Sequence, residues 1–208
     1  MESLINTKDN RHEEPKRSGQ LNLDLWMGMV KPCGDVTILT VPIHEEDSRM
    51  AYLFYCMGMI DNQALHHSIL QELDQWQPHD GKSNIPLLMP LDEDTTETHA
   101  FKMLSAGILI VCIDNYWYQA NIANPPGRQP EESSSEVSVK GPRDGFVEEI
   151  DVNIGLIRKR LKTPDLKIVR YTVGEENRAD IALLYMQTAA NPEWVNEAKK
   201  RLEGVHAK

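Results

Sequence analysis

Residues Val137 to Val173 read VSVKGPRDGFVEEIDVNIGLIRKRLKTPDLKIVRYTV and contain a rigid turn, a long amphipathic helix and the strand that follows. The turn spans Gly141 to Gly145, where Pro142 fixes φ near about −65° and the two glycines can adopt the positive φ values that other residues avoid. We therefore expect one fixed path for the chain at this turn, with Gly145 in a conformation that a β-carbon would oppose.

A helix is predicted directly after the turn, because apolar residues recur at spacings of three and four and so share one helical face. These residues are Phe146, Ile150, Ile154, Ile157 and Leu161. Acidic residues crowd the first turns and basic residues the last, so both ends complement the helix dipole. We expect Phe146 to anchor this helix in the core. Thr163 precedes Pro164 and is biased away from helical angles, which ends the helix before a strand at Leu166–Val173.

Ten residues of this stretch resemble a signature of the A subunits of bacterial spore germinant receptors, within their soluble N-terminal domain. The family pattern is a Gly-Pro-Arg-acidic-Gly-Phe turn, a helix with an Asn, and an Ile-Arg-basic-Arg cluster before a proline. The matching residues are Gly141, Pro142, Arg143, Gly145, Phe146, Asn153, Ile157, Arg158, Arg160 and Pro164. The match is specific because it pairs a rigid turn with a fixed helix register.

The composition is that of a globular protein. The 208 residues are 40% hydrophobic and 26% charged, enough for one good core or two small ones. The formal net charge of −10 disfavours nonspecific binding to nucleic acid or to anionic lipid. The cysteines Cys33, Cys56 and Cys112 are far apart in apolar surroundings, which favours reduced core residues over a disulfide or metal site.

No segment of the sequence is apolar enough to span a membrane, since the longest apolar run is Ile108–Ile113 and a spanning helix needs about 20 residues. Residues 1–20 are polar and lack a secretory signal, so we expect a disordered tail. The resemblance implies that full-length A subunits continue into several membrane helices. This chain is then either the soluble part of a longer protein or a naturally short relative.

Residues 21–123 predict a first α/β lobe. Leu21, Leu25 and Met29 suggest a short helix that ends near Pro32, followed by strands 36–41 and 51–57. A helix is expected from Asp61 to Pro78, with Leu65, Ile69, Leu73 and Trp76 on one face. A helix 95–106 and a hairpin 107–122 with Asp114-Asn115 as its turn complete the lobe. Residues 124–140 are rich in Pro, Ser and Glu, which is typical of a linker.

Residues 141–208 predict a second lobe that repeats part of the first at an offset of 130 residues. Without a gap, Asp35 meets Asp165, Leu53 meets Leu183 and Tyr55 meets Tyr185. The second copy closes with a helix that begins at Asn191 and ends at Gly204. The first copy continues into a further helix and hairpin, whereas the second stops. We therefore predict an α/β fold of mixed α+β type with two similar lobes, each a small mixed sheet with flanking helices, the second truncated. A truncated sheet would expose edges that seek partners.

No enzymatic activity, cofactor or metal site is predicted. The sequence has no spacing typical of a nucleophile with its base, of a phosphate loop or of a metal constellation. The basic cluster Arg158, Lys159, Arg160 and Lys162 is open to two interpretations. It is a solvated helix end that complements the dipole, or it grips a phosphate or lipid headgroup.

The resemblance implies a non-enzymatic component of a nutrient-responsive spore germinant receptor, acting in receptor assembly or signal transmission. Its place would be the core (cytoplasmic) side of the spore inner membrane, with the other receptor subunits as partners and no nucleic acid. One alternative is a two-lobed sensor with a small ligand, such as a nutrient molecule, in the cleft between lobes. A less favoured alternative is an uncharacterised enzyme.

Arginines of the family motif generate two further hypotheses, because a planar guanidinium pairs bidentately with carboxylates. Arg143, Arg158 and Arg160 either tie the two lobes together through acidic residues of the same chain or contact another receptor subunit. The full set of interaction or structural-motif candidates is Gly141, Pro142, Arg143, Gly145, Phe146, Arg158 and Arg160.

Overall fold

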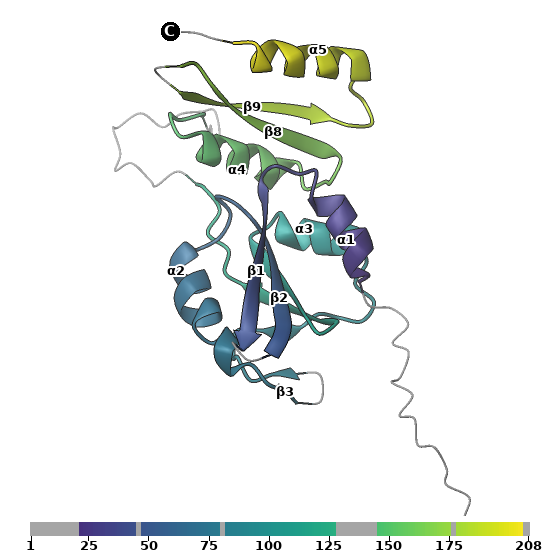
Figure 1. Cartoon of the computed structure of the whole chain (residues 1–208), viewed down its shortest axis with the longest axis vertical. Helices are drawn as coiled ribbons and strands as arrows, with labels where there is room; N and C mark the ends of the chain where they lie inside the picture. Colours follow the sequence, from purple (N-terminus) through teal and green to yellow (C-terminus); the bar gives the residue numbers. More distant parts are fainter. Residues whose placement is uncertain (1–20, 45–46, 80–81, 128–144, 176–177, 206–208) are drawn as a thin grey trace, which may run out of the picture.

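The computed structural model describes residues 21–44, 47–79, 82–127, 145–175 and 178–205. We call residues 21–127 the N-terminal unit and residues 145–205 the C-terminal unit; they lie end to end in Figure 1. The tail 1–20, most of the linker 124–140, and the turn residues Gly141, Pro142 and Arg143 lie outside the described residues. The predicted α+β class is confirmed, and the predicted division into domains stays a prediction.

The N-terminal unit is built around a five-stranded sheet in which every ladder is antiparallel and the order is β1-β2-β6-β7-β5. Its strands are β1 (Val36–His44), β2 (Asp47–Cys56), β5 (Met89–Pro90), β6 (Ile108–Ile113) and β7 (Tyr116–Asn121). A separate ribbon joins β3 (Pro78–His79) to β4 (Lys82–Ser83). The hairpin β6–β7 turns at Asp114 and Asn115, whose φ values of 50° and 63° confirm the predicted turn type.

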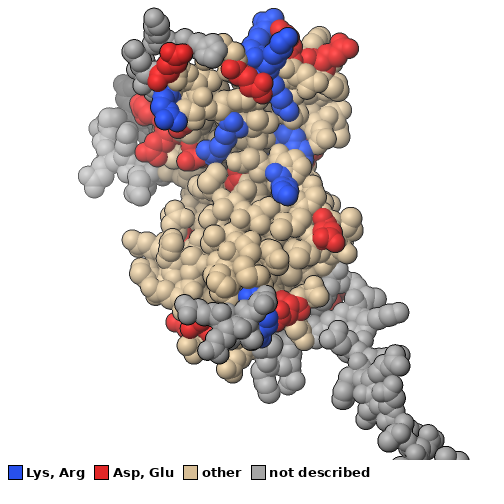
Figure 2. Space-filling view, in the orientation of Figure 1, with Lys and Arg blue, Asp and Glu red and all other residues tan. Residues whose placement is uncertain are grey.

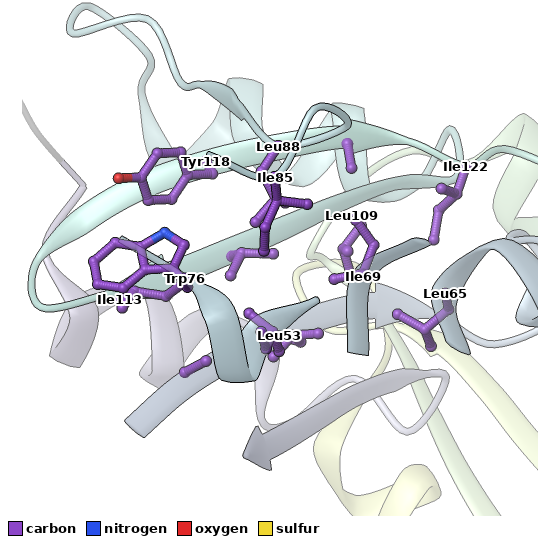
Figure 3. Close-up of a cluster of buried hydrophobic side chains, with 14 of the residues drawn as sticks. Leu53, Leu65, Ile69, Trp76, Ile85, Leu88, Leu109, Ile113, Tyr118 and Ile122 are labelled. Atoms are coloured by element: carbon purple, nitrogen blue, oxygen red, sulfur yellow. The ribbon is translucent and has the colours of Figure 1, made fainter. Parts of the chain in front are cut away.

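One face of this sheet is covered by a helix that changes its winding along its length. It begins as α2 (Asn62–Leu65) and continues through a π-helical turn (His66–Leu70) and a 3₁₀ turn (Leu73–Gln75). Asp61 caps it by accepting hydrogen bonds from the backbone N–H groups of Gln63 and Ala64. The side chains that the sequence pattern placed on one face are all buried, and Figure 3 shows several of them against the strands. They are Leu65, Ile69, Leu73 and Trp76.

The opposite face is covered by α1 (Leu23–Val30) and α3 (Glu97–Leu104). The short helix predicted from Leu21, Leu25 and Met29 is present as α1, but Leu25 is 65% exposed whereas Trp26 and Val30 are fully buried. The ring of Trp26 meets Phe54 and Trp117 edge-on at centroid distances of 5.8 and 6.3 Å. Burying the largest ring of the helix yields more than burying Leu25, so the helix turns its Trp26–Val30 side to the sheet.

The C-terminal unit consists of α4 (Ile150–Arg160), β8 (Leu166–Val173), β9 (Ala179–Met186) and α5 (Pro192–Glu203). The hairpin β8–β9 lies between α4 and α5 (Figure 1). Its core consists of Ile154 of α4 against Leu166 and Ile168 of β8. By contrast, α5 has no buried residue, and its Trp194 is 75% exposed. The C-terminal unit is therefore thinly packed on the side of α5.

The two hairpins β1–β2 and β8–β9 have the same register. The seven pairs from Leu166↔Met186 to Thr172↔Asp180 each have a counterpart in β1–β2, 130 residues earlier; beyond Pro42 the register of β1–β2 shifts. The backbone follows the same rule: the N–H of Met57 donates to the Asp35 carbonyl, and the N–H of Gln187 donates to the Asp165 carbonyl. The offset that relates the two sequences therefore also relates the two hairpins.

The expectations for Phe146 and Gly145 are wrong. Phe146 is 70% exposed, and α4 begins only at Ile150, with Glu149 as its N-cap. Asn153 explains this: its side chain accepts from the N–H of Val147 at 2.8 Å and donates to the Val147 carbonyl at 2.7 Å. These two bonds hold the segment beside the helix instead of as its first turn. Gly145 is not among the glycines with positive φ, and a β-carbon there would meet nothing within 4 Å.

The three cysteines are free and buried, as predicted. Burial raises the pKa of the Cys112 thiol to about 12 and also raises the pKa of Cys33 and of Cys56. At neutral pH these thiols are therefore protonated, which makes them poor nucleophiles.

Phe146→Ala should leave the free energy of unfolding within about 0.5 kcal/mol of wild type, because the ring is already in solvent. Phe54→Ala, which empties a fully buried site, should cost about 3–5 kcal/mol. Urea unfolding followed by tryptophan fluorescence measures both. A loss of more than about 1.5 kcal/mol for Phe146→Ala would contradict the placement of this ring.

Cys112 predicts a pH dependence of stability. The unfolded thiol ionises near its ordinary pKa of about 8.5, whereas the folded thiol keeps its proton up to about 12, so the folded state binds more protons in this window. The contribution of Cys112 to stability is complete below about pH 8 and should be lost as the pH rises toward 12. The stability difference between wild type and Cys112→Ala should therefore shrink over this window; a constant difference would refute the prediction.

Candidate functional site at the junction of the two units

The two units meet through main-chain contacts between the segment after α1 and strand β8. Cys33 forms a parallel bridge with Ile168, and the N–H of Gly34 donates to the Ile168 carbonyl at 3.0 Å. A β-carbon on Gly34 would lie 2.3 Å from that carbonyl oxygen. Only glycine permits this approach, and Cys33 and Gly34 thus cover the outer edge of β8 at Ile168.

A buried ion pair lies next to this bridge. Arg158, on α4, donates from Nε to Oδ2 of Asp35 at 2.6 Å and from Nη2 to Oδ1 at 2.8 Å. The side chains are 0% and 1% exposed, respectively. Asp35 immediately precedes β1, so the pair joins residues 123 positions apart, one from each unit. Two parallel bonds between planar groups fix both the distance and the orientation of the units.

The remaining donors of Arg158 bind carbonyl groups of the loop that follows α4. Nη1 donates to Leu161 at 3.3 Å and to Thr163 at 2.7 Å, and Nη2 donates to Leu166 at 3.2 Å. The guanidinium carbon also lies 5.3 Å from the ring centroid of Phe101 on α3. Burial lowers the pKa of Arg158, but the hydrogen bonds and the charge of Asp35 outweigh this effect, so its pKa is raised and the side chain stays charged.

Small residues let α4 approach the N-terminal unit closely. A β-carbon on Gly155 would lie 3.0 Å from Cγ of Pro126 and 3.4 Å from the carbonyl oxygen of Gly58. A β-carbon on Gly58, whose φ is +72°, would lie 3.0 Å from the Asp151 carbonyl oxygen. Gly58 and Gly155 therefore allow the short distance between α4 and the N-terminal unit.

Further polar contacts surround the ion pair. Arg170 of β8 donates to the Gly34 carbonyl at 3.2 Å and pairs with Asp151 of α4. Lys159 donates to the Pro126 carbonyl at 3.3 Å. Lys167 is 8% exposed, and its Nζ lies 4.0 Å from Sγ of Cys33. The junction is thus a packed and largely satisfied polar network with one strong pair at its centre.

The candidate residues predicted from the sequence differ in their location and contacts. Arg158 makes the tie within the chain that one hypothesis expected, whereas Arg160 is exposed at the end of α4. Gly145 and Phe146 are exposed. The sequence analysis missed Gly34, Asp35, Gly58 and Gly155. A charged residue directly before an apolar strand was the available signal for Asp35, but its partner is too distant in sequence to be inferred.

The basic residues do not form a continuous basic surface on the face seen in Figure 2. Lys and Arg side chains lie over the C-terminal unit there, interspersed with acidic ones, and the N-terminal unit is mostly uncharged. Such a mixed surface does not favour phosphate or lipid headgroups on that face. Within the described ranges, no cluster of three or more His, Cys, Asp or Glu residues is suited to a metal ion, and no helix is long and apolar enough to cross a membrane.

Comparison with known proteins identifies relatives over most of the chain. The model of the family described as Bacillus/Clostridium GerA spore germination protein matches residues 25–208. Spore germination protein XA of Bacillus anthracis is 30% identical over 202 residues, which cover 92% of this chain and 41% of that protein. Uncharacterized membrane protein YfkQ of Bacillus subtilis is 35% identical over 206 residues, 95% of this chain and 40% of that protein. The chain thus spans about two fifths of these relatives.

One solved structure has a similar fold. The crystal structure of the N-terminal domain of the A subunit of the Bacillus megaterium spore germinant receptor GerK3 aligns with a TM-score of 0.61 and 21% sequence identity. The alignment covers 90% of this chain and 72% of that domain. At this identity the similarity concerns the fold.

Arg158→Met should lower the free energy of unfolding by about 3–5 kcal/mol, because it leaves the Asp35 carboxylate buried without its partner. Adding Asp35→Asn should recover part of that loss, which a double-mutant cycle quantifies as a coupling energy. Arg201→Met is the matched control, since its pair with Glu197 is exposed and should cost about 0.5 kcal/mol or less. Equal losses for the two Arg→Met variants would show that the junction pair does not hold the units.

Proposed function

Because the chain belongs to the GerA spore germination protein family, we propose that it is a non-enzymatic component of a nutrient-responsive spore germinant receptor, acting in receptor assembly or signal transmission. The observation behind this proposal is the buried Arg158–Asp35 pair, which ties the two units together. A domain that binds partners must hold the surfaces of its two units in a fixed relative position. The Arg158–Asp35 pair holds the units in that position.

The pair is suited to transmitting a displacement. Arg158 contacts Asp35, the loop after α4 and the ring of Phe101. A movement of α4 relative to the N-terminal unit would therefore have to break or distort these contacts. A partner that rotates the C-terminal unit must either carry the N-terminal unit along or expose two buried charges, which is costly. Motion imposed on one unit is therefore passed to the other as a rigid-body displacement.

We further propose that the partners are other receptor subunits and that the chain acts at the core (cytoplasmic) side of the spore inner membrane. The germination proteins among its relatives and the membrane protein YfkQ support this placement. Arg160, a residue of the family motif that is exposed at the end of α4, is the residue that we propose for such a contact.

The alternative, a small ligand between the units, has less support. The side chains at the junction contact one another: Arg158, Asp35 and Cys33 are at most 1% exposed, and glycines bring the backbones together. A ligand site would need a concave space lined by side chains with unused polar groups. The tie between units is the better-supported role.

Arg160→Glu should leave the protein folded, because the residue is exposed, but should reduce co-purification with the receptor subunits from spores of the source bacterium. Lys200→Glu, an equally exposed charge reversal on α5, is the matched control and should bind as wild type does. Thermal unfolding of each variant separates loss of association from loss of fold. Unchanged co-purification and unchanged nutrient-triggered germination for Arg160→Glu would count against this contact.

A further inference from the structure

Lys167 is a buried cation at the junction of the two units. It lies on β8 beside the bridge between Cys33 and Ile168, and only 8% of it is exposed. Within the described ranges, no carboxylate pairs with its amino group, whose one polar contact is with Sγ of Cys33 at 4.0 Å. A lysine is almost never buried to this extent without a charged partner. Packing alone therefore does not explain an amino group that lies against a thiol at this place.

The thiol of Cys33 is held in position by groups of both units. Its Sγ lies 3.7 Å from the carbonyl oxygen of Met29 on α1, 3.8 Å from that of Pro164 and 4.0 Å from that of Leu166. Cys33 is 1% exposed. Cys33 and Lys167 are 134 positions apart, one in each unit. A bond between their side chains would therefore join the two units.

Two cations act on Cys33 against the effect of burial. Burial raises the pKa of its thiol, and the charges of Lys167 and Arg158 lower that pKa in part. Cys56 and Cys112 have no lysine among the charged groups that act on their pKa. Oxidation by a peroxide proceeds through the thiolate, so it is slow at Cys33 in neutral solution, but it yields a sulfenic acid beside an amine.

The amine of Lys167 is the nucleophile placed to react with a sulfenic acid at Cys33. The sulfur of a sulfenic acid is electrophilic and condenses with a thiol or with a nitrogen. Dissolved thiols are kept away from Cys33 by its burial. Lys167 carries its amine on a flexible four-carbon chain, which allows Nζ to close the remaining distance to Sγ.

We propose that Cys33 and Lys167 form an oxidative modification site, in which a peroxide causes Sγ and Nζ to be joined by a covalent S–N bond. In the first step the O–O bond of hydrogen peroxide breaks, the thiol becomes a sulfenic acid and one water leaves. In the second step Nζ, after releasing a proton to solvent, attacks the sulfur; the S–N bond forms, the S–O bond breaks and a second water leaves. The sulfur is oxidised by two electrons, the peroxide is reduced by two, and the protein loses two hydrogen atoms.

This bond would be a second tie between the units, and one that depends on redox state. It closes a loop of 134 positions and so restricts the unfolded chain. It holds β8 to the segment after α1, whereas the Arg158–Asp35 pair holds α4. A thiol that reaches the site when the junction opens locally attacks Sγ, which breaks the S–N bond and releases the amine.

Peptide mapping by mass spectrometry of the protein treated with hydrogen peroxide tests this proposal. In wild type, the tryptic peptide of Cys33 should be joined to that of Lys167, and the joined species should be about 2 Da lighter than the two peptides together. Dithiothreitol should separate them. A Cys33 that stays unmodified, gains only oxygen or forms a disulfide with Cys56 would overturn the proposal.

Lys167→Arg is the decisive variant, because a guanidinium keeps the charge but stays protonated and is no nucleophile. In this variant the joined peptide should be absent and Cys33 should carry only oxygen. Lys159→Arg is the matched control: Lys159 lies at the same junction but donates to the Pro126 carbonyl instead of to a thiol, so the joined peptide should persist.

Thermal unfolding gives a second measurement. After peroxide treatment, wild type and Lys159→Arg should unfold about 10 °C above Lys167→Arg, because only they contain the added tie. Equal midpoints for all three treated proteins would overturn the proposed link between the units. If Lys167→Arg fails to fold, the peptide map of wild type decides alone.

Discussion

The Arg158–Asp35 pair is the interaction on which the rest of the arrangement depends. A guanidinium and a carboxylate at most 1% exposed are stable only together, because either one alone would be a desolvated charge. The pair fits only when α4, the start of β1 and the loop before β8 take one relative position. The neighbouring Gly34 and Gly155 make that position reachable, since a β-carbon on either would crowd the facing backbone or ring. Specificity of arrangement, more than net stability, is what such a pair contributes.

The two units are related but not equivalent. Their hairpins share a register, their helices begin at caps 130 residues apart, Asp61 and Asn191, and the carbonyls of Asp35 and Asp165 accept equivalent backbone bonds. The Asp35 carboxylate nevertheless binds Arg158, whereas that of Asp165 binds the backbone and hydroxyl of Thr188. One repeated position thus serves the junction in the first copy and a local turn in the second.

This inequality extends to the sheets. In the N-terminal unit, β6 covers the edge of β2, and helices bury large side chains on both faces. In the C-terminal unit the hairpin is covered mainly by α4, and no residue of α5 is itself buried. Among the described residues, the C-terminal unit is thus less completely packed than the N-terminal unit.

The local elements and the family can be predicted from the amino-acid sequence alone. Periodicity predicted the buried face of the helix after Asp61 and, in α4, the buried Ile154 with the partly buried Ile150 and Ile157, although Phe146 and Leu161 of the same predicted face are exposed. Turn chemistry predicted the Asp114–Asn115 hairpin, and the turn and helix motif indicated the spore germination family that the family model matches. These features depend on residues only a few positions apart. Tertiary structure alone decided that Arg158 pairs with Asp35, that Asn153 holds Val147 beside α4, and that Phe146 faces solvent. Each of these depends on which groups meet in space, and a pairing across 123 residues leaves no periodic signal in the sequence.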